Sequence, residues 1–170
     1  MDPLSQGLVG ATASQSLSNR KDIVTATVLG FLSGMAADLD IFIRSSEDPL
    51  LFLEFHRQFT HSLIFMPIGG LICACVFWLL LHFVFNKTNL SFIKIYLFST
   101  VGYVTHGLLD SCTSYGTQLF WPFSNERVAW NNVSIIDPIF TLTLLTLVVF
   151  AATKRSVRIS YIAAFFAVSY

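Results

Sequence analysis

The sequence of 170 residues has little charge, since Asp, Glu, Lys and Arg together make up only 12% of it. A soluble domain usually carries about 25% charged residues. Hydrophobic residues account for 54% of the chain, and its mean hydropathy is +0.67. This balance excludes an ordinary soluble domain and indicates an integral membrane protein.

Other absences exclude specific classes of site. The three cysteines, Cys73, Cys75 and Cys112, lack the spacing of a zinc finger, and two of them lie in an apolar run where they act as packing residues. The chain has no Gly-rich phosphate loop, G-x-S-x-G elbow, basic stripe, internal repeat or low-complexity region, so we expect no nucleic-acid partner. No basic segment precedes an apolar core at the N-terminus, so no cleavable signal peptide is expected.

Apolar runs of membrane-spanning length dominate the rest. A helix that crosses the hydrocarbon needs roughly 20 apolar residues. Four runs fit this length: Ile23–Ile43, Leu63–Phe85, Phe92–Leu109 and Ile135–Thr153. The shorter Leu4–Leu17 is rich in small residues, which let helices approach closely, and we expect it to form a hairpin with the run after "SNRKD". The final "SYIAAFFAVSY" indicates another helix, either short or truncated at Tyr170.

These runs predict an all-α fold, a polytopic transmembrane helix bundle of about four to five helices, one of them a short N-terminal helix. We expect residues 1–170 to form a single membrane-embedded domain with a polar site at one membrane face.

Basic and acidic residues fall on opposite sides of the predicted membrane spans. Seven of the ten basic residues fall in alternate connections, which the positive-inside rule assigns to the cytoplasm: Arg20, Lys21, Lys87, Lys94, Lys154, Arg155 and Arg158. The other face receives Arg44, Arg57 and Arg127 and most of the acids: Asp38, Asp40, Glu47, Asp48, Glu54, Asp110, Glu126 and Asp137. We therefore expect a multi-pass protein of the bacterial inner membrane whose polar site faces outward.

The polar residues near that outer face form a candidate site. Asp38 and Asp40 diverge by about 200° on a helix, so both can face one site only if the helix changes there. His56 and His61, five residues apart, do not share a face of a continuous helix. Ionisable residues near a membrane segment are functional candidates by default.

The stretch "THGLLDSCTSYGTQLFWPF" is the most informative. His106 and Asp110 are at i and i+4, so they lie one turn apart on one helix face, which suits a divalent-metal half-site or an acid–base pair. Asp137, before Pro138, either caps the following helix or hydrogen-bonds a metal ligand.

The mixture of donors favours a metal. Nitrogen and oxygen ligands suit Zn²⁺, with Mn²⁺ or Fe²⁺ as alternatives. Five candidate ligands exceed one tetrahedral structural site, so we expect an open catalytic ion or two ions: Asp38, Asp40, His61, His106 and Asp110. His56 and Arg57 are the candidates for acid–base chemistry and for binding an anionic group.

"HRQFTHSL", "DLD", "THGLLDSCTSYGTQLFWPFS" and "IIDPIF" together resemble the YdjM-like family of predicted inner-membrane, metal-dependent hydrolases. The resemblance covers nearly the whole chain. It places six residues on the family's polar positions: Asp38, Asp40, His56, His61, His106 and Asp110. Its accompanying positions are Arg57, Thr113, Gly116 and Asp137. Two positions depart from the family pattern: Gln6 stands where the family has histidine, and Ala37 where it has proline.

Three functions remain open. The first is a metal-dependent hydrolase acting at the outer face on a membrane lipid, as an ester or phosphoester. The second is a metal-independent His–Asp lipid phosphatase. The third is a non-enzymatic metal-binding membrane protein, a scaffold or sensor. The sequence does not define the oligomeric state.

Overall fold

The computed structural model describes residues 1–42, 56–84 and 90–170. The described residues form six α-helices and contain no β-strand beyond one isolated bridge between Thr117 and Val128. The all-α fold is thus confirmed. The six α-helices of the described residues exceed the expected four to five because the C-terminal segment forms a separate helix, Val157–Ser169.

The helices follow the predicted runs closely. They are α1 (Pro3–Ser16), α2 (Ile23–Ala36), α4 (Met66–Leu79), α5 (Phe92–Ser111), α6 (Pro138–Lys154) and α7 (Val157–Ser169). Short helices of other types extend or precede them: the 3₁₀ helices η1 (Ala37–Phe42) and η2 (Phe59–His61), and the π-helical η3 (Leu80–Val84).

Three helical segments are long and apolar enough to cross a membrane, among the residues that the structure describes. They are Ile23–Phe42, Met66–Val84 and Phe92–Ser111, whereas α6 and α7 are shorter apolar helices.

Helix starts follow local sequence signals. Asp2 accepts a hydrogen bond from Ser5 N at 2.9 Å and stands before Pro3, while Asp137 accepts one from Phe140 N at 3.1 Å and stands before Pro138. An acidic N-cap followed by proline at the first helical position satisfies free N–H groups and presets the helical backbone. The same device thus starts α1 and α6.

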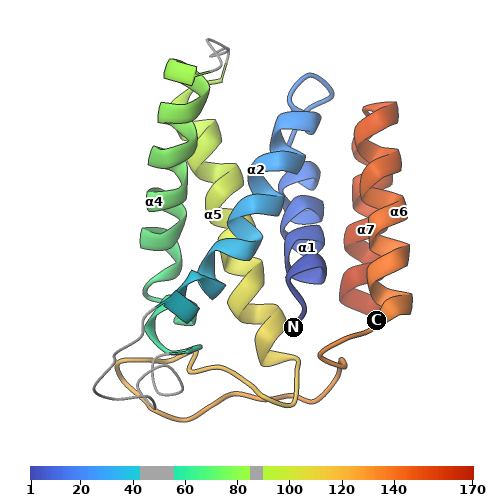
Figure 1. Ribbon diagram of the computed structural model, residues 1–170. Coiled ribbons are helices and arrows are strands. Elements are labelled where there is room, and N and C mark those ends of the chain that lie inside the picture. Colours follow the sequence, from blue (N-terminus) through green and yellow to red (C-terminus); the bar gives the residue numbers. More distant parts are fainter. Residues whose placement is uncertain (43–55, 85–89) are drawn as a thin grey trace.

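The first helix occupies the centre of the bundle (Figure 1). It packs against α2, α5, α6 and α7, while α4 packs on the far side of α5. α1 forms an antiparallel hairpin with α2, as its small residues predicted. The bundle therefore encloses a helix that is too short to span a bilayer alone.

Backbone approach between α2 and α5 depends on glycine. A Cβ added at Gly102 would lie 2.6 Å from Gly30 O and 2.4 Å from Ser33 Oγ. Because a backbone oxygen cannot rotate away, any side chain at this position pushes the two helices apart.

We expect Gly102→Leu to destabilise the protein by about 1–3 kcal/mol or more, the usual cost of overpacking. Thermal unfolding in detergent measures it. Leu97→Ala, on the exposed side of the same helix, is the control and should change the midpoint little. Equal midpoints for the two variants would contradict the close approach of α2 and α5.

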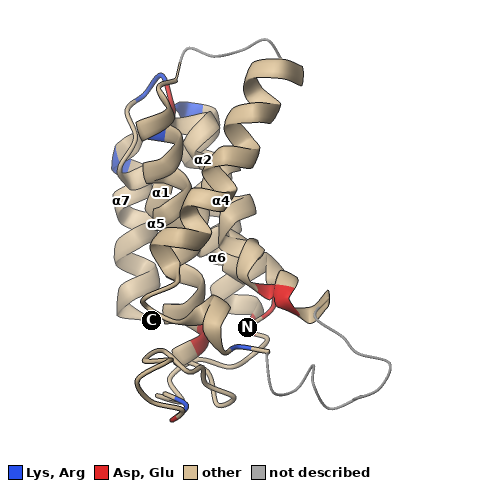
Figure 2. Cartoon of the chain, turned by 90° about the vertical axis from the view of Figure 1, so that its left-hand side faces the viewer, with Lys and Arg blue, Asp and Glu red and all other residues tan. Residues whose placement is uncertain are grey.

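Basic side chains gather at one end of the bundle (Figure 2). Those from the α1–α2 connection, the start of α5 and the α6–α7 connection are Arg20, Lys21, Lys94, Lys154, Arg155 and Arg158. The opposite end carries most of the red acidic residues of Figure 2, together with Arg57 beside Asp110 and Arg127 beside His56. Asp22 is an exception, since it lies at the basic end and accepts from Lys94. The expected sorting also included Arg44, Glu47, Asp48, Glu54 and Lys87, which lie outside the described residues.

Candidate metal centre

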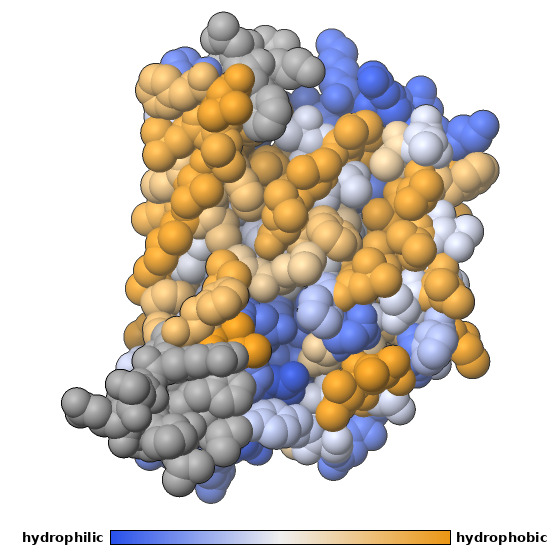
Figure 3. All heavy atoms as spheres, viewed as in Figure 1, coloured by the Kyte–Doolittle hydropathy of each residue, from blue (hydrophilic) through white to orange (hydrophobic). Residues whose placement is uncertain are grey.

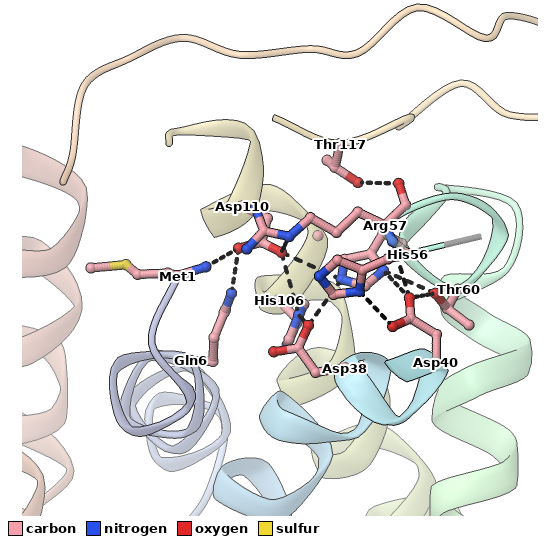
Figure 4. A network of polar contacts seen from close by, with 12 residues as sticks. Met1, Gln6, Asp38, Asp40, His56, Arg57, Thr60, His106, Asp110 and Thr117 are labelled. Atoms are coloured by element: carbon pink, nitrogen blue, oxygen red, sulfur yellow. Dashed lines mark hydrogen bonds and ion pairs between the residues drawn. The ribbon is translucent and has the colours of Figure 1, made fainter. Parts of the chain in front are cut away.

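The predicted polar residues come together at the end of the bundle opposite the basic connections (Figure 4). Asp38 and Asp40 come from η1, His106 and Asp110 from the last turns of α5, and His61 from η2. His61, His106 and Asp110 have no exposed surface. Segments distant in sequence therefore supply one buried cluster.

The change at the end of α2 explains how both aspartates contribute. The α-helix ends at Ala36 and tightens into η1, where three residues complete a turn. Residues two apart then lie about 120° from each other around the axis, whereas the roughly 200° rotation along an α-helix leaves them about 160° apart. Asp38 turns toward His106 and Asp40 toward His56, so one turn flanks the cluster on two sides.

Four ligand atoms surround one position, which we call the meeting point: Asp38 Oδ1, His61 Nε2, His106 Nε2 and Asp110 Oδ2. Asp38 lies 3.5 Å from His61 and 3.2 Å from His106, and Asp110 lies 3.3 Å and 3.5 Å from the same two nitrogens. Bonds of about 2.0–2.1 Å to a tetrahedral Zn²⁺ place ligand atoms about 3.3–3.4 Å apart. The buried Asp/His cluster could therefore hold a metal ion.

The outer nitrogens of both histidines are held by hydrogen bonds. His106 Nδ1 lies 2.6 Å from Gly34 O, and a carbonyl oxygen only accepts, so this nitrogen carries the proton. Thr60 Oγ1 donates to Asp40 at 2.7 Å and therefore accepts from His61 Nδ1 at 2.9 Å. In the neutral rings both Nε2 lone pairs face the meeting point, the arrangement that orients metal-ligating histidines.

Asp40 organises a neighbouring group. Its carboxylate contacts His56 Nδ1 at 2.8 Å, Arg57 N at 3.1 Å and Thr60 Oγ1 at 2.7 Å. Asp38, Asp40 and His56 form a second set of potential ligands that shares Asp38 with the first. The geometry thus permits one ion or two.

Arg57 lies against this cluster in an unusual backbone conformation. Its φ is 62°, a left-handed value that non-glycine residues adopt rarely. Thr117 Oγ1 donates to its carbonyl at 3.1 Å, and Gln118 N does so at 3.1 Å. These bonds to the α5–α6 connection hold the strained residue in place.

The guanidinium of Arg57 points toward Asp110, with Nε 3.2 Å from Oδ2, and stacks on Tyr115 at 4.8 Å. The residue is only 7% exposed. Its Nη1 is buried and, among the described residues, has no hydrogen-bond partner. A buried donor without a partner is costly, so this atom marks a place for an acceptor.

The cluster attracts positive charge. Burial alone would lower the pKa of His61, but hydrogen bonds to the carboxylates of Asp110, Asp38 and Asp40 outweigh burial and raise that pKa to about 10. Three carboxylates therefore favour a cation at this position, whether a proton or a metal ion.

Gln6, which stands where the family has histidine, also lies in the site. Gln6 Nε2 donates to Asp110 Oδ1 at 2.7 Å, and the α-amino group of Met1 contacts the same oxygen. These contacts leave Asp110 Oδ2 facing the histidines. Gln6 therefore holds a carboxylate that could ligate the ion, and four ligand atoms remain without a histidine at position 6.

Thr113 and Asp137, the two residues expected to support the site, differ in their distance from the cluster. Thr113 Oγ1 donates to Asp110 O at 2.8 Å and so stabilises the end of α5 beneath the cluster. Asp137 caps α6 and accepts from Tyr170 Oη at 2.9 Å. The structure thus gives Asp137 the capping role, and its hydrogen bonds do not reach the cluster.

Two contributors escaped the sequence reasoning. The carbonyl of Gly34 and the hydroxyl of Thr60 orient the histidines. A backbone carbonyl carries no sequence signal. Thr60 immediately precedes a candidate ligand, which is the signal that could have identified it.

The apolar helices around a buried Asp/His cluster define a helical membrane protein with a potential metal site. Residues 1–170 match the family described as YdjM inner membrane protein, so the chain belongs to that family and is an inner membrane protein, as the sequence resemblance predicted.

Two curated relatives are similar to parts of the chain. The "Uncharacterized protein YfhP" of Bacillus subtilis (strain 168) is 25% identical over 129 residues, covering 75% of this chain and 37% of the relative. The "Inner membrane protein YbcI" of Escherichia coli (strain K12) is 37% identical over 76 residues, covering 42% of this chain and 39% of the relative. The chain thus spans about two fifths of the length of these relatives. No solved structure gives a significant match.

Proposed function

We propose that the protein is a divalent-metal-dependent hydrolase that cleaves a phosphoester of a membrane lipid at the outer face of the inner membrane. One observation carries the proposal: a four-atom ligand set lies beside a buried arginine whose Nη1 has no partner among the described residues. Guanidinium groups recognise phosphate oxygens through paired, charge-assisted hydrogen bonds. This favours a phosphoester over a carboxylic ester.

Each residue has a distinct role in this proposal. Asp38, His61, His106 and Asp110 hold the ion, Zn²⁺ in preference to Mn²⁺ or Fe²⁺ because the spacing suits tetrahedral N and O ligands. A divalent ion held there would act as a Lewis acid toward the phosphoester, and it would acidify a water taken up as a fifth ligand, since the four protein ligands fill a tetrahedral shell.

His56 and Arg57 then act on the substrate. His56, oriented by its 2.8 Å contact with Asp40, accepts a proton from the attacking water. Arg57 binds the phosphoryl oxygens and stabilises the charge that develops on them. Asp38, Asp40 and His56 could instead hold a second ion, in which case a carboxylate of the site would take the role of base.

The direction of the site rests on the basic connections. Six described Lys and Arg residues lie at the other end of the bundle, and basic connections favour the cytoplasmic side. The cluster would then face outward, and its partner would be a membrane lipid rather than a nucleic acid.

Turnover of a phospholipid panel by the purified protein in liposomes tests the proposal. We expect phosphoester hydrolysis that stops on chelation, returns with Zn²⁺ and is lost in His61→Ala. His82→Ala is the matched control, because His82 lies in η3 at the opposite end of α4 and stacks on Trp78.

Two outcomes would contradict the proposal. Turnover that survives chelation would support the metal-independent His–Asp phosphatase. Stoichiometric metal binding without turnover of any lipid would support a non-enzymatic metal-binding protein.

A further inference from the structure

An apolar groove of about 240 Å³ lies between the end of α2 with η1 and the first half of α4. One end of its wall is polar and belongs to the candidate metal centre. Ala36, Leu39, Ile72 and Cys73 line its apolar side, and Asp40 and Thr60 line its polar end.

The groove opens on the apolar surface that two candidate spans form. It lies between two of the candidate spans, Ile23–Phe42 and Met66–Val84, and its rim residues Leu39 and Ile72 are 61% and 54% exposed. Apolar side chains cover α4 in Figure 3, and hydrophilic ones gather beside it at the level of the candidate metal centre. An occupant can therefore move in sideways from the lipid.

The interior of the groove offers almost nothing to a polar occupant. Tyr103 forms part of the wall, and its hydroxyl is already used, donating to Thr60 O at 2.9 Å. The volume is below the roughly 300–1,000 Å³ of pockets that enclose a whole small-molecule ligand. It suits a segment of one hydrocarbon chain.

We infer that this groove holds one acyl chain of a lipid substrate while the headgroup reaches Arg57. The identity of the headgroup rests on the proposed function, whereas the placement of the chain rests on the groove itself. The position of the groove supports this occupant: its apolar wall ends at Asp40 and Thr60, which belong to the candidate metal centre. Arg57 N donates to the same Asp40 carboxylate at 3.1 Å, and its guanidinium lies across the centre beside Asp110. The groove therefore leads from the apolar surface to a polar site that could hold a cation. A membrane lipid with an anionic phosphate has this polarity from end to end.

The groove contributes position more than affinity. An acyl chain that leaves the bilayer for the groove exchanges one apolar medium for another, so packing, not hydrophobic transfer, holds it. Its function would be to place the phosphoester against the candidate metal centre.

Photolabelling tests the inference without turnover. The probe is a phosphatidic acid with a diazirine in one acyl chain, incorporated into liposomes with the protein, and mass spectrometry maps the labelled residues. In the wild type we expect labelling of Ala36 and Ile72 to exceed that of the outward-facing Leu71 and Val76.

Two cysteines on one helix provide a matched pair. Cys73 lines the groove, whereas Cys75 is exposed on α4 beside Trp78 and Phe92. Cys73→Trp should fill the groove and remove most of its labelling, and Cys75→Trp should leave the labelling unchanged. Ala36→Leu fills the groove from α2 and should act like Cys73→Trp if that variant fails to fold.

Equal labelling of groove and outward-facing residues in the wild type would overturn the inference, as would unchanged groove labelling in both filled variants. The failures are distinguishable. Groove labelling without hydrolysis of any lipid refutes the proposed function and leaves the acyl site, whereas hydrolysis without groove labelling refutes the acyl site.

Discussion

His106→Ala is expected to abolish tight binding of a divalent ion. The substitution removes the Nε2 atom that lies 3.2 Å from Asp38 and 3.5 Å from Asp110, and no neighbouring imidazole can replace it because His61 already faces the same point. Loss of an outer hydrogen-bond partner alone costs about 10–100-fold in metal affinity. Loss of a ligand should therefore exceed about 100-fold.

Competition with a chromophoric chelator measures this change on purified protein. His82→Ala is again the control, since it removes the same ring from η3 at the far end of α4. We expect that variant to bind the ion like the wild type. Equal affinities for His106→Ala and the wild type would show that the ion, if bound, lies elsewhere.

Arg57→Met is expected to retain the ion and lose catalysis. The guanidinium contacts Asp110 but is not among the four ligand atoms, so its removal leaves the ligand set intact. Removal of one donor that stabilises developing charge typically costs about 10²–10³-fold in turnover. Arg57→Lys should recover only part of this loss, because an ammonium lacks the planar fork.

Arg127→Met is the matched control for this change. Arg127 stacks on Tyr115 at 5.0 Å, like Arg57, but it is exposed and donates to His56 O rather than to a carboxylate. The measurements are kcat/KM on a lipid phosphoester and metal content. Wild-type turnover in Arg57→Met would remove the anion-binding role on which the choice of a phosphoester depends.

Helical periodicity predicted the part of the site that lies on a regular helix. His106 and Asp110, at i and i+4, both reach the cluster because they share a face of α5. The apolar runs predicted the helices for a related reason, since burial in a bilayer demands about 20 apolar residues whatever their order.

The part of the site that lies outside regular α-helices could not be predicted in the same way. His56, Arg57 and His61 reach the site through a turn with a left-handed residue and a short 3₁₀ helix, for which no repeat in the sequence exists. The spacing of His56 and His61 showed that they do not share a face of one helix, but it did not give their direction. Tertiary contacts from Thr117 and Gln118 fix that turn.

Gln6 shows the limit of reading one position at a time. As an amide it is a poorer zinc ligand than the histidine of the family pattern, so the position read alone indicates a site that lacks a ligand. In the fold it donates to Asp110 from α1, a helix whose central place depends on small residues packed against α2. Its contribution could be identified only once the helices were in place.

X-ray absorption at the zinc edge, on protein purified with Zn²⁺ supplied, tests the central claim most directly. The account predicts one or more tightly bound ions per chain. The spectrum should show two nitrogen and two oxygen ligands from the protein at about 2.0–2.2 Å. The His106→Ala variant should give a changed spectrum. A protein that retains no ion, or one whose spectrum shows sulfur ligands from its cysteines, would contradict it.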